Sequence, residues 1–494
     1  MSTRPNRRSR GRAARPLRPA LRSLGLSLGL ALALGAAAAA TPPLAPLAPV
    51  PSLARIGIDG IGADRLTALA ADPELHWWLE LDRVLVVLAP PGALARLGRD
   101  FEVELLAEPP GSGPFVLVRD RRRDAGDDGF AEIARGGRWT LGRLRAEPEA
   151  PLPAWPEGGG ELVPSERAPR GGHRFAFAPN RVLARAGSNL FPAGEEPEPL
   201  AVDPEIVDAV DVDRWFAAVS DLAAWNRWTR GTEIHEARDW LVARFGELPD
   251  FLVTTQQFTV PSPTTNAWNV LATLPGLGSG ARRVIVGGHY DSTSESPAVA
   301  APGAEDNASG CAGVLEMARI LAVWRPAATV VFACYSGEEQ GLYGGTAHAQ
   351  SVVNEGLASS VVLMLNMDMI GYTGDSDLDV LVETGSTHAA LLGRFQAAAT
   401  AFTGLRVVTD TSPGGSDHVP FVNRGMPGVL TIENDYGSYP HYHRTTDLPG
   451  ALTPVMAENI LRMNVAVLVE LAGVPLFADG FESGGKGQWP ATTP

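Results

Sequence analysis

Between residues 251 and 472, short apolar segments that suit β-strands alternate with longer segments that suit helices. Several short segments, such as RRVIVGGH and ATVVFACYS, are apolar at consecutive positions, so both faces of each strand are expected to be buried. Helices between such strands indicate an α/β fold, with a mostly parallel mixed sheet that helices cover on both faces. The expected strands are 251–260, 267–275, 282–289, 328–336, 360–370, 377–384, 405–410 and 427–434, and the expected helices are 308–324, 340–355, 387–403 and 452–472.

This pattern, with two more helices before it that break near Arg230 and Gly231, predicts a main domain over residues 201–474. Residues 41–108 predict a small N-terminal α/β unit, with strands at 82–89 and 101–107 and a helix at 90–98. Residues 109–200 are rich in Pro, Gly and charged residues and predict a linker region. Residues 475–494 have no periodic pattern and predict a mobile C-terminal tail.

The first 40 residues have the composition of a bacterial-type signal peptide. Eight arginines fall within the first 22 residues, and an apolar stretch of small residues follows at 24–41. This order predicts export to the periplasm or the extracellular medium, with cleavage between about Ala38 and Ala40. A membrane anchor that is kept is the alternative, because the stretch is close to the length that spans a bilayer.

Charge and cysteine content exclude two classes of protein. A formal net charge of −15 and a pI near 5.1 argue against nucleic acid as a partner, because phosphate binding requires a basic surface. Cys311 and Cys334 are the two cysteines of the chain, so it is not a small disulfide-stabilised domain. A bridge between them and two buried free thiols are both compatible with the sequence.

Carboxylates and imidazoles follow the expected strands. In an open α/β sheet, functional side chains collect beyond the carboxyl ends of the strands. A single acid at one strand end would be explained as a helix cap or a turn residue. Several acids and histidines at one edge would repel each other and lose hydration unless bound cations compensate their charge. Nitrogen and carboxylate ligands without cysteine suit zinc or another borderline divalent ion, and one carboxylate can bridge two ions about 3.5–4 Å apart. The residues in question are His289, Asp291, Asp306, Glu338, Glu339, Asp368, His441 and His443.

Six segments carry a family resemblance: GGHYDS, AEDNASG, FACYSGEEQGLYGG, LNMDMIG, GGSDHVPF and YHRTTD. Their order resembles the co-catalytic two-zinc aminopeptidases, the group of secreted bacterial leucyl aminopeptidase and aminopeptidase Y, over residues 205–473. The resemblance implies a zinc exopeptidase, phosphorylase/hydrolase-like fold that holds two Zn²⁺ ions per chain. It implies that His289 and Asp368 bind one ion, that Glu339 and His443 bind the other, and that Asp306 bridges both.

The resemblance also implies roles for three further residues. Glu338 matches the general base, Asp291 matches a carboxylate that orients the His289 imidazole, and Tyr442 lies where some members have a tyrosine that polarises the scissile carbonyl. We expect His443 rather than His441 to be the ligand, because its spacing to Asp447 fits the family. Ser416, Asp417 and His418 are expected to support the site, and His348 to be a packed or surface residue.

The function expected from the resemblance is removal of N-terminal residues from peptides or proteins. We expect the enzyme to be secreted, to be a monomer and to have no membrane attachment after the signal peptide is removed. A carboxypeptidase, with Arg424 or Arg444 binding the substrate carboxylate, and a glutaminyl cyclase are alternatives on the same fold. An inactive peptide-binding module is the alternative from another class. Residues 41–200 are expected to be either a removed pro-segment or a retained domain. Calcium at Asp375, Asp377 and Asp379 is a further, less favoured hypothesis.

Overall fold

The structure is a computed structural model that describes residues 50–107, 113–123, 125–126, 128–154, 172–195, 197–278 and 280–474. The expected signal peptide at 1–40 and the expected tail at 475–494 lie outside these residues. Among the described residues, no helix has the length and hydropathy needed to cross a bilayer. Cys311 and Cys334 are both buried and are not bridged to each other.

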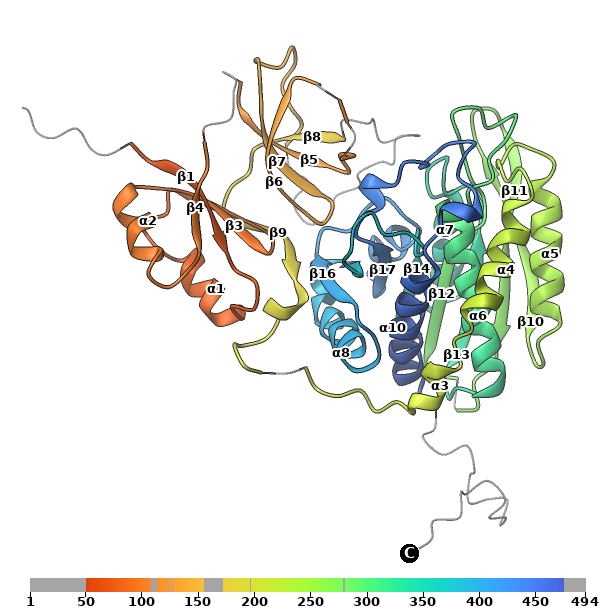
Figure 1. Cartoon of the computed structure of the whole chain (residues 1–494). Coiled ribbons are helices and arrows are strands. Elements are labelled where there is room, and N and C mark those ends of the chain that lie inside the picture. Colours follow the sequence, from red (N-terminus) through yellow and green to blue (C-terminus); the bar gives the residue numbers. More distant parts are fainter. Residues whose placement is uncertain are drawn as a thin grey trace, which may run out of the picture. The chain divides into compact units, whose positions relative to one another are not determined.

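The expected α/β architecture is confirmed (Figure 1). Four neighbouring strands at the centre of the main domain, in the order β13-β12-β14-β17, pair in parallel, and antiparallel strands flank them on both sides. The full strand order in this sheet is β10-β11-β13-β12-β14-β17-β15-β16-β9-β2-β3-β1-β4. The main-domain strands are β10 (Leu252–Val260), β11 (Thr265–Leu274), β12 (Arg283–His289), β13 (Thr329–Tyr335), β14 (Val361–Met367), β15 (Asp379–Thr384), β16 (Arg406–Asp410) and β17 (Gly428–Glu433).

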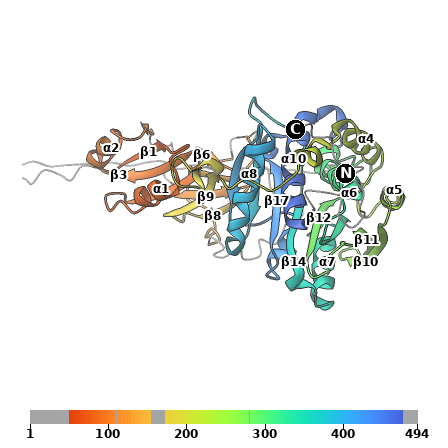
Figure 2. The ribbon, with the colours of Figure 1, turned by 90° about the horizontal axis from the view of Figure 1, so that it is seen from below.

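Helices cover both faces of these strands, because alternate apolar side chains of one strand point to opposite faces. Val284 and Val286 of β12 lie in one core cluster with residues of α4, α5, α6, α8 and α10, whereas Ile285 packs in another cluster with α7 and α9. Figure 2 shows α6 and α10 on one side of the strands and α7 on the other. The main-domain helices are α3 (Pro204–Asp208), α4 (Val212–Ala223), α5 (Ile234–Gly246), α6 (Gly310–Val323), α7 (Tyr343–Asn354), α8 (Leu392–Phe402), α9 (Val419–Val422) and α10 (Pro454–Ala472).

The N-terminal residues form the α/β unit that the sequence predicts and extend it at the N-terminal end. The expected strands and helix appear as β3 (Val84–Ala89), β4 (Val103–Leu105) and α2 (Pro91–Leu97). The earlier elements, which the sequence did not indicate, are β1 (Ser52–Gly57), α1 (Ala63–Ala70) and β2 (Trp77–Asp82).

The linker expected over residues 109–200 is wrong. Five strands lie in the described part of this region, and four of them form a second sheet in the order β6-β7-β5-β8. The composition misled because the arginines and acids of this region pair with each other, while side chains such as Val116, Trp139 and Phe175 are buried between them. The strands are β5 (Phe115–Arg119), β6 (Phe130–Gly136), β7 (Trp139–Leu144), β8 (His173–Ala176) and β9 (Arg181–Ala186).

Helix α10 provides a test of the core. Leu468 is fully buried, whereas Val455 on the same helix is 46% exposed. We expect Leu468→Ala to lower the free energy of unfolding by about 2–5 kcal/mol, because it removes buried apolar area and leaves a cavity. Val455→Ala, the matched control, is expected to change it by less than about 0.5 kcal/mol. Urea unfolding followed by circular dichroism measures both, and equal effects would contradict the placement of α10 in the core.

Candidate metal centre

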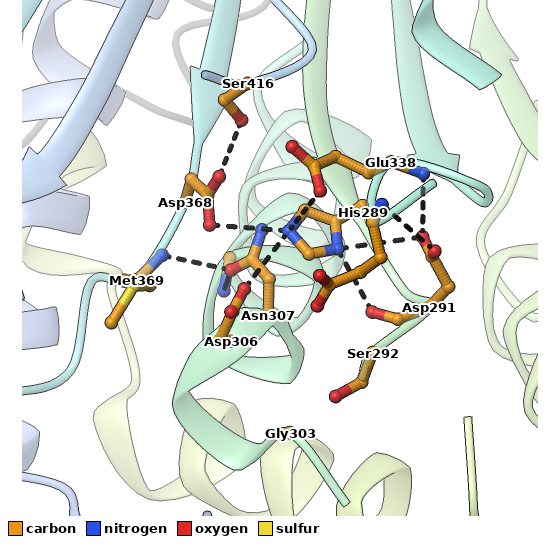
Figure 3. Close-up of polar contacts among 12 residues, drawn as sticks. His289, Asp291, Ser292, Gly303, Asp306, Asn307, Glu338, Asp368, Met369 and Ser416 are labelled. Atoms are coloured by element: carbon orange, nitrogen blue, oxygen red, sulfur yellow. Dashed lines mark hydrogen bonds and ion pairs between the residues drawn. The ribbon is translucent and has the colours of Figure 1, made fainter. Parts of the chain in front are cut away.

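The residues predicted as metal ligands come together at one edge of the sheet. His289 is the last residue of β12, and Asp368 directly follows β14. Glu338 and Glu339 lie in the loop after β13, and Asp306 lies just before α6. Neighbouring parallel strands place their carboxyl ends at the same edge, so residues about 150 positions apart can share one site (Figure 3).

The distances divide the ligand atoms into two sets that share Asp306. His289 Nε2 lies 3.4 Å from Asp306 Oδ1 and 3.4 Å from Asp368 Oδ1. His443 Nε2 lies 3.0 Å from the other oxygen, Asp306 Oδ2, and 3.2 Å from Glu339 Oε2. Ligand atoms at about 2.0–2.2 Å from a tetrahedral zinc ion are about 3.3–3.5 Å apart, which is close to these values. Each histidine therefore faces its own carboxylate and one oxygen of Asp306.

The unpaired atoms of the site also fit metal ions. His289 Nε2, Asp368 Oδ1 and Glu339 Oε1 are buried, and none of them has a hydrogen-bond partner among the described residues. Buried polar atoms are normally hydrogen-bonded, so these three atoms require another partner. His289 forms groups of metal-ligand geometry both with Glu338 and Asp368 and with Asp306 and Glu339.

The electrostatic field of the site favours positive charge. Burial by itself lowers the pKa of His289, but the nearby Asp368 and Glu338 carboxylates raise it well above its usual value. Burial also lowers the pKa of His443, but the Glu339 and Asp306 carboxylates outweigh burial and raise this pKa to about 10. Burial raises the pKa of Glu339 to about 7, against the effect of His443. A site that binds protons this strongly also attracts divalent cations.

Asp291 supports the site through a different group from the one predicted. His289 Nδ1 is 3.0 Å from the main-chain carbonyl of Asp291, and the carboxylate is 3.7 Å away. That carboxylate accepts hydrogen bonds from the backbone N–H groups of Glu338 (3.3 Å) and Glu339 (3.4 Å) and from the Thr229 hydroxyl (2.7 Å). One residue thus orients the imidazole with its backbone and the paired glutamates with its side chain.

Asp306 is fixed by residues whose importance the sequence did not show. Asp447 accepts the backbone N–H groups of Glu305 (2.9 Å) and Asp306 (3.1 Å). Asn307 is fully buried, accepts the N–H groups of Gly310 and Met369, and donates to the Met367 carbonyl, so it ties the Asp306 segment to the end of β14. The sequence offered only a spacing for Asp447, and that spacing does not specify these contacts.

A buried arginine holds the loops behind the site, and no motif of the sequence indicated it. The guanidinium of Arg227 donates to the main-chain carbonyls of Tyr290 (2.7 Å), Leu222 (2.8 Å) and Gly303 (2.7 Å). Tyr290 directly follows the ligand His289, and Gly303 lies shortly before the ligand Asp306. Arg227 therefore ties both ligand segments to the end of α4, where Leu222 lies. Burial of Arg227 lowers its pKa to about 10.

Tyr442 lies beside the site. Its ring stacks on the ring of His443 with 3.9 Å between centroids, and burial raises the pKa of its phenol well above the usual value. His443 has a φ of 53°, in the left-handed region that non-glycine residues rarely adopt. Such strain is held by surrounding contacts, and here it directs the imidazole toward Asp306 and Glu339.

The remaining histidines lie outside the ligand set, as expected. His441 is bound by the Thr446 hydroxyl at 2.9 Å, and His418 contacts Glu383 at 3.2 Å. His348 is buried and hydrogen-bonded to the Tyr335 hydroxyl at 2.9 Å, and burial lowers its pKa to about 4.

The hypothesised calcium ligands have partners within the protein. Asp379 pairs with Arg406 and accepts from Asn434 at 3.0 Å, and Asp377 lies 3.9 Å from Arg83. Two of the three carboxylates that calcium would need are thus directed at arginines of the same chain, and Asp375 accepts the backbone N–H of Asp377.

Relatives among known proteins cover part of the chain. Residues 269–468 match the model of peptidase family M28. A probable zinc metalloprotease of Pyricularia oryzae is 32% identical over 337 residues, which cover 56% of this chain and 65% of that protein. A probable zinc metalloprotease of Pyrenophora tritici-repentis is 32% identical over 244 residues, 40% of this chain and 56% of that protein. This chain therefore spans 56–65% of the length of these two relatives.

Solved structures are similar at a lower level. The LapA aminopeptidase of Legionella pneumophila aligns with 20% identity and a TM-score of 0.48 over 56% of this chain and 76% of its own. A glutaminyl cyclase of an Acidobacteriales bacterium aligns with 20% identity and a TM-score of 0.44 over 57% of this chain and 98% of its own. The match of residues 269–468 to the model of peptidase family M28 agrees with the resemblance seen in the motifs.

Proposed function

We propose that the chain is a secreted zinc metallo-aminopeptidase that hydrolyses the N-terminal peptide bond of peptides or proteins at a two-zinc centre. Asp306 is the observation that carries the proposal. One of its oxygens faces His289 and the other faces His443, at 3.4 and 3.0 Å, which is the arrangement of a carboxylate that bridges two ions. The curated relatives, described as probable zinc metalloproteases, support zinc as the metal.

Five residues would hold the metal, two by imidazole and three by carboxylate. Bound zinc would polarise the scissile carbonyl and lower the pKa of a coordinated water toward about 7. His289 and Asp368 lie on one side of Asp306, and Glu339 and His443 lie on the other. Because Asp306, Asp368, Glu339 and His289 are at most 8% exposed, bulk water has little access to these ligands.

Glu338 is proposed to move the proton. Its Oε2 is 4.0 Å from His289 Nε2, farther than the carboxylates of Asp306 and Asp368, so it borders the ligand set. Burial raises the pKa of Glu338 well above its usual value, with Asp368 and Glu339 adding to the rise. A carboxylate with a raised pKa can accept a proton from the attacking water and donate it to the leaving amine. The Tyr442 phenol, beside His443, is proposed to contact the substrate carbonyl.

The alternatives have less support. A carboxypeptidase needs a cation for the substrate carboxylate, but the Arg424 guanidinium binds the Pro420 carbonyl and Gln350. An inactive binding module would have no reason to keep Glu338 at the edge of a complete ligand set. A glutaminyl cyclase remains the second candidate on this fold, and the number of bound ions separates it from the proposed enzyme.

Glu338→Gln tests the base. We expect the variant to keep its zinc and to lose about 10²–10⁴-fold in kcat, because the amide cannot accept the proton. Metal analysis and initial rates on an aminoacyl chromogenic substrate measure the two quantities. Glu355→Gln is the matched control, since Glu355 is an exposed glutamate after α7, and it is expected to behave like the native chain. Full activity of Glu338→Gln would reject the role of Glu338.

Metal content tests the dinuclear centre. We expect about two zinc ions per native chain, and about one in His443→Ala, because the second ion loses its nitrogen ligand while Asp306 still serves the first. Inductively coupled plasma mass spectrometry on gel-filtered protein gives both numbers. A native chain with one ion would contradict the two-zinc centre and favour the cyclase.

Substrate panels test the exopeptidase. We expect hydrolysis of peptides that have a free N-terminal amine, and at least about 10²-fold slower hydrolysis after N-acetylation, because carboxylates such as Glu338 and Asp368 would bind the ammonium group. Chelation should abolish the activity and added zinc should restore it. Equal rates on free and acetylated peptides would exclude an aminopeptidase.

A further inference from the structure

A buried glutamate joins the N-terminal region to the metal centre. Glu383, near the end of β15, has no exposed surface. Its Oε2 lies 3.2 Å from Arg119 Nη2 and 2.9 Å from Arg138 Nε, and both arginines are also buried. Arg119 ends β5 and Arg138 directly precedes β7, so both belong to the second sheet in the region that the sequence predicts to be a linker. A carboxylate this deeply buried needs such cations to stay charged.

The same glutamate binds the loop formed by residues 414–418. Its Oε1 accepts the backbone N–H of Gly414 and lies 3.2 Å from His418 Nε2. Both ends of the loop are thus bound to one carboxylate. Burial raises the pKa of Glu383, but Arg138 and Arg119 outweigh this effect and bring it to about 2, so the group is charged at neutral pH.

The centre of this loop touches a metal ligand. Ser416 Oγ donates to Asp368 Oδ2 at 2.6 Å, which leaves Asp368 Oδ1 directed at His289 (Figure 3). Asn366 donates to Ser416 Oγ at 2.8 Å and fixes the hydroxyl from the side of β14. The neighbouring Asp417 accepts the N–H of Gly345 at the start of α7, the helix that follows the paired glutamates. Partners of this kind set the orientation and basicity of metal ligands.

The loop is shaped to receive the arginines. A Cβ atom at Gly414 would lie 2.6 Å from Arg119 Nη1, and one at Gly415 would lie 3.3 Å from Arg138 Nη1. A side chain at position 414 would therefore require the Arg119 guanidinium to move from its place beside Glu383. The two glycines of the GGSDHVPF segment therefore have a function that the sequence alone did not show.

The N-terminal region holds a second loop of the site. Arg122 stacks on the Tyr442 ring at 4.5 Å and donates to the Tyr442 carbonyl at 3.3 Å, so the ring lies between Arg122 and His443. Arg123 pairs with Asp435 at 2.8 Å, in the segment that leads from β17 to Tyr442. Strand β9 of the N-terminal region also pairs with β16 of the main domain, which extends the same sheet.

We propose that the N-terminal region is a permanent part of the metallopeptidase, in which Arg119 and Arg138 act through Glu383 and the 414–418 loop to position the zinc ligand Asp368. The proposal rests on the proposed zinc function and favours the retained domain over the removed pro-segment. Removing residues 115–144 would leave the Glu383 carboxylate without its two cations, and Glu383 is the group that binds both ends of the 414–418 loop. Arg119 and Arg138 are positioning residues, because neither contacts the metal ligands directly.

Zinc affinity of the full chain tests the linkage. We expect Arg119→Met to raise the zinc Kd about 10–100-fold, the usual effect of losing a partner behind a metal ligand, with a parallel loss of kcat and little change in KM. Competition with a chromogenic chelator gives the Kd. The control is Arg185→Met, which removes another ion pair of the N-terminal region, with Glu80, and should leave the zinc Kd within about twofold.

Glu383→Gln is combined with Arg119→Met in a double-mutant cycle. It also tests the proposal by itself if Arg119→Met does not fold. We expect Glu383→Gln alone to raise the zinc Kd, and the double variant to be no worse than the poorer single variant, because both changes remove one interaction. A folded Glu383→Gln with native zinc affinity would overturn the proposal. A native chain that binds no zinc would instead reject the proposed function itself.

The N-terminus of the active, secreted enzyme provides the second test. We expect intact-mass and N-terminal sequencing to show that active protein retains residues 115–144. An active form that starts near residue 200 and holds zinc with the native Kd would overturn the proposal.

Discussion

The structure depends on concentrated negative charge at the edge of a sheet. Asp306, Glu338, Glu339 and Asp368 are brought within reach of one another, and the surrounding protein removes most of the water that would screen them. Such an arrangement is unfavourable unless cations neutralise it. The two histidines provide nitrogen ligands, and their raised pKa values show how strongly the carboxylates favour a positive partner.

The rest of the fold keeps these groups in place. Parallel strands bring the backbone positions together, but the side chains are directed by buried hydrogen bonds to main-chain groups, made by Asp291, Asn307, Asp447 and Arg227. Each of these side chains joins two segments that are distant in sequence. A metal site of this type therefore requires a rigid set of loops, and the N-terminal region is proposed to contribute to that rigidity through Glu383.

The main domain could be predicted well because its two periodicities are strong. Strands that are apolar on both faces and helices of ten or more residues leave few alternatives, and α6, α7, α8 and α10 differ from the expected helices only at their ends. The N-terminal region was harder. The charged side chains of β6 are satisfied by nearby partners: Glu132 pairs with Arg135 of the same strand and with Arg121, which composition does not reveal. Residues 109–200 were therefore wrongly expected to be a linker.

The sequence by itself determined which side chains could form the metal site, because a histidine or an acid follows each central strand and parallel strands end at one edge. The sequence also indicated that the candidate ligands are histidines and acids and that no cysteine is among them. The tertiary structure decided which oxygen of Asp306 faces which histidine and which group of Asp291 orients His289. It also decided that Arg119 and Arg138 lie against Glu383. These contacts join residues up to 264 positions apart, and no local pattern in the chain encodes a pairing over that distance.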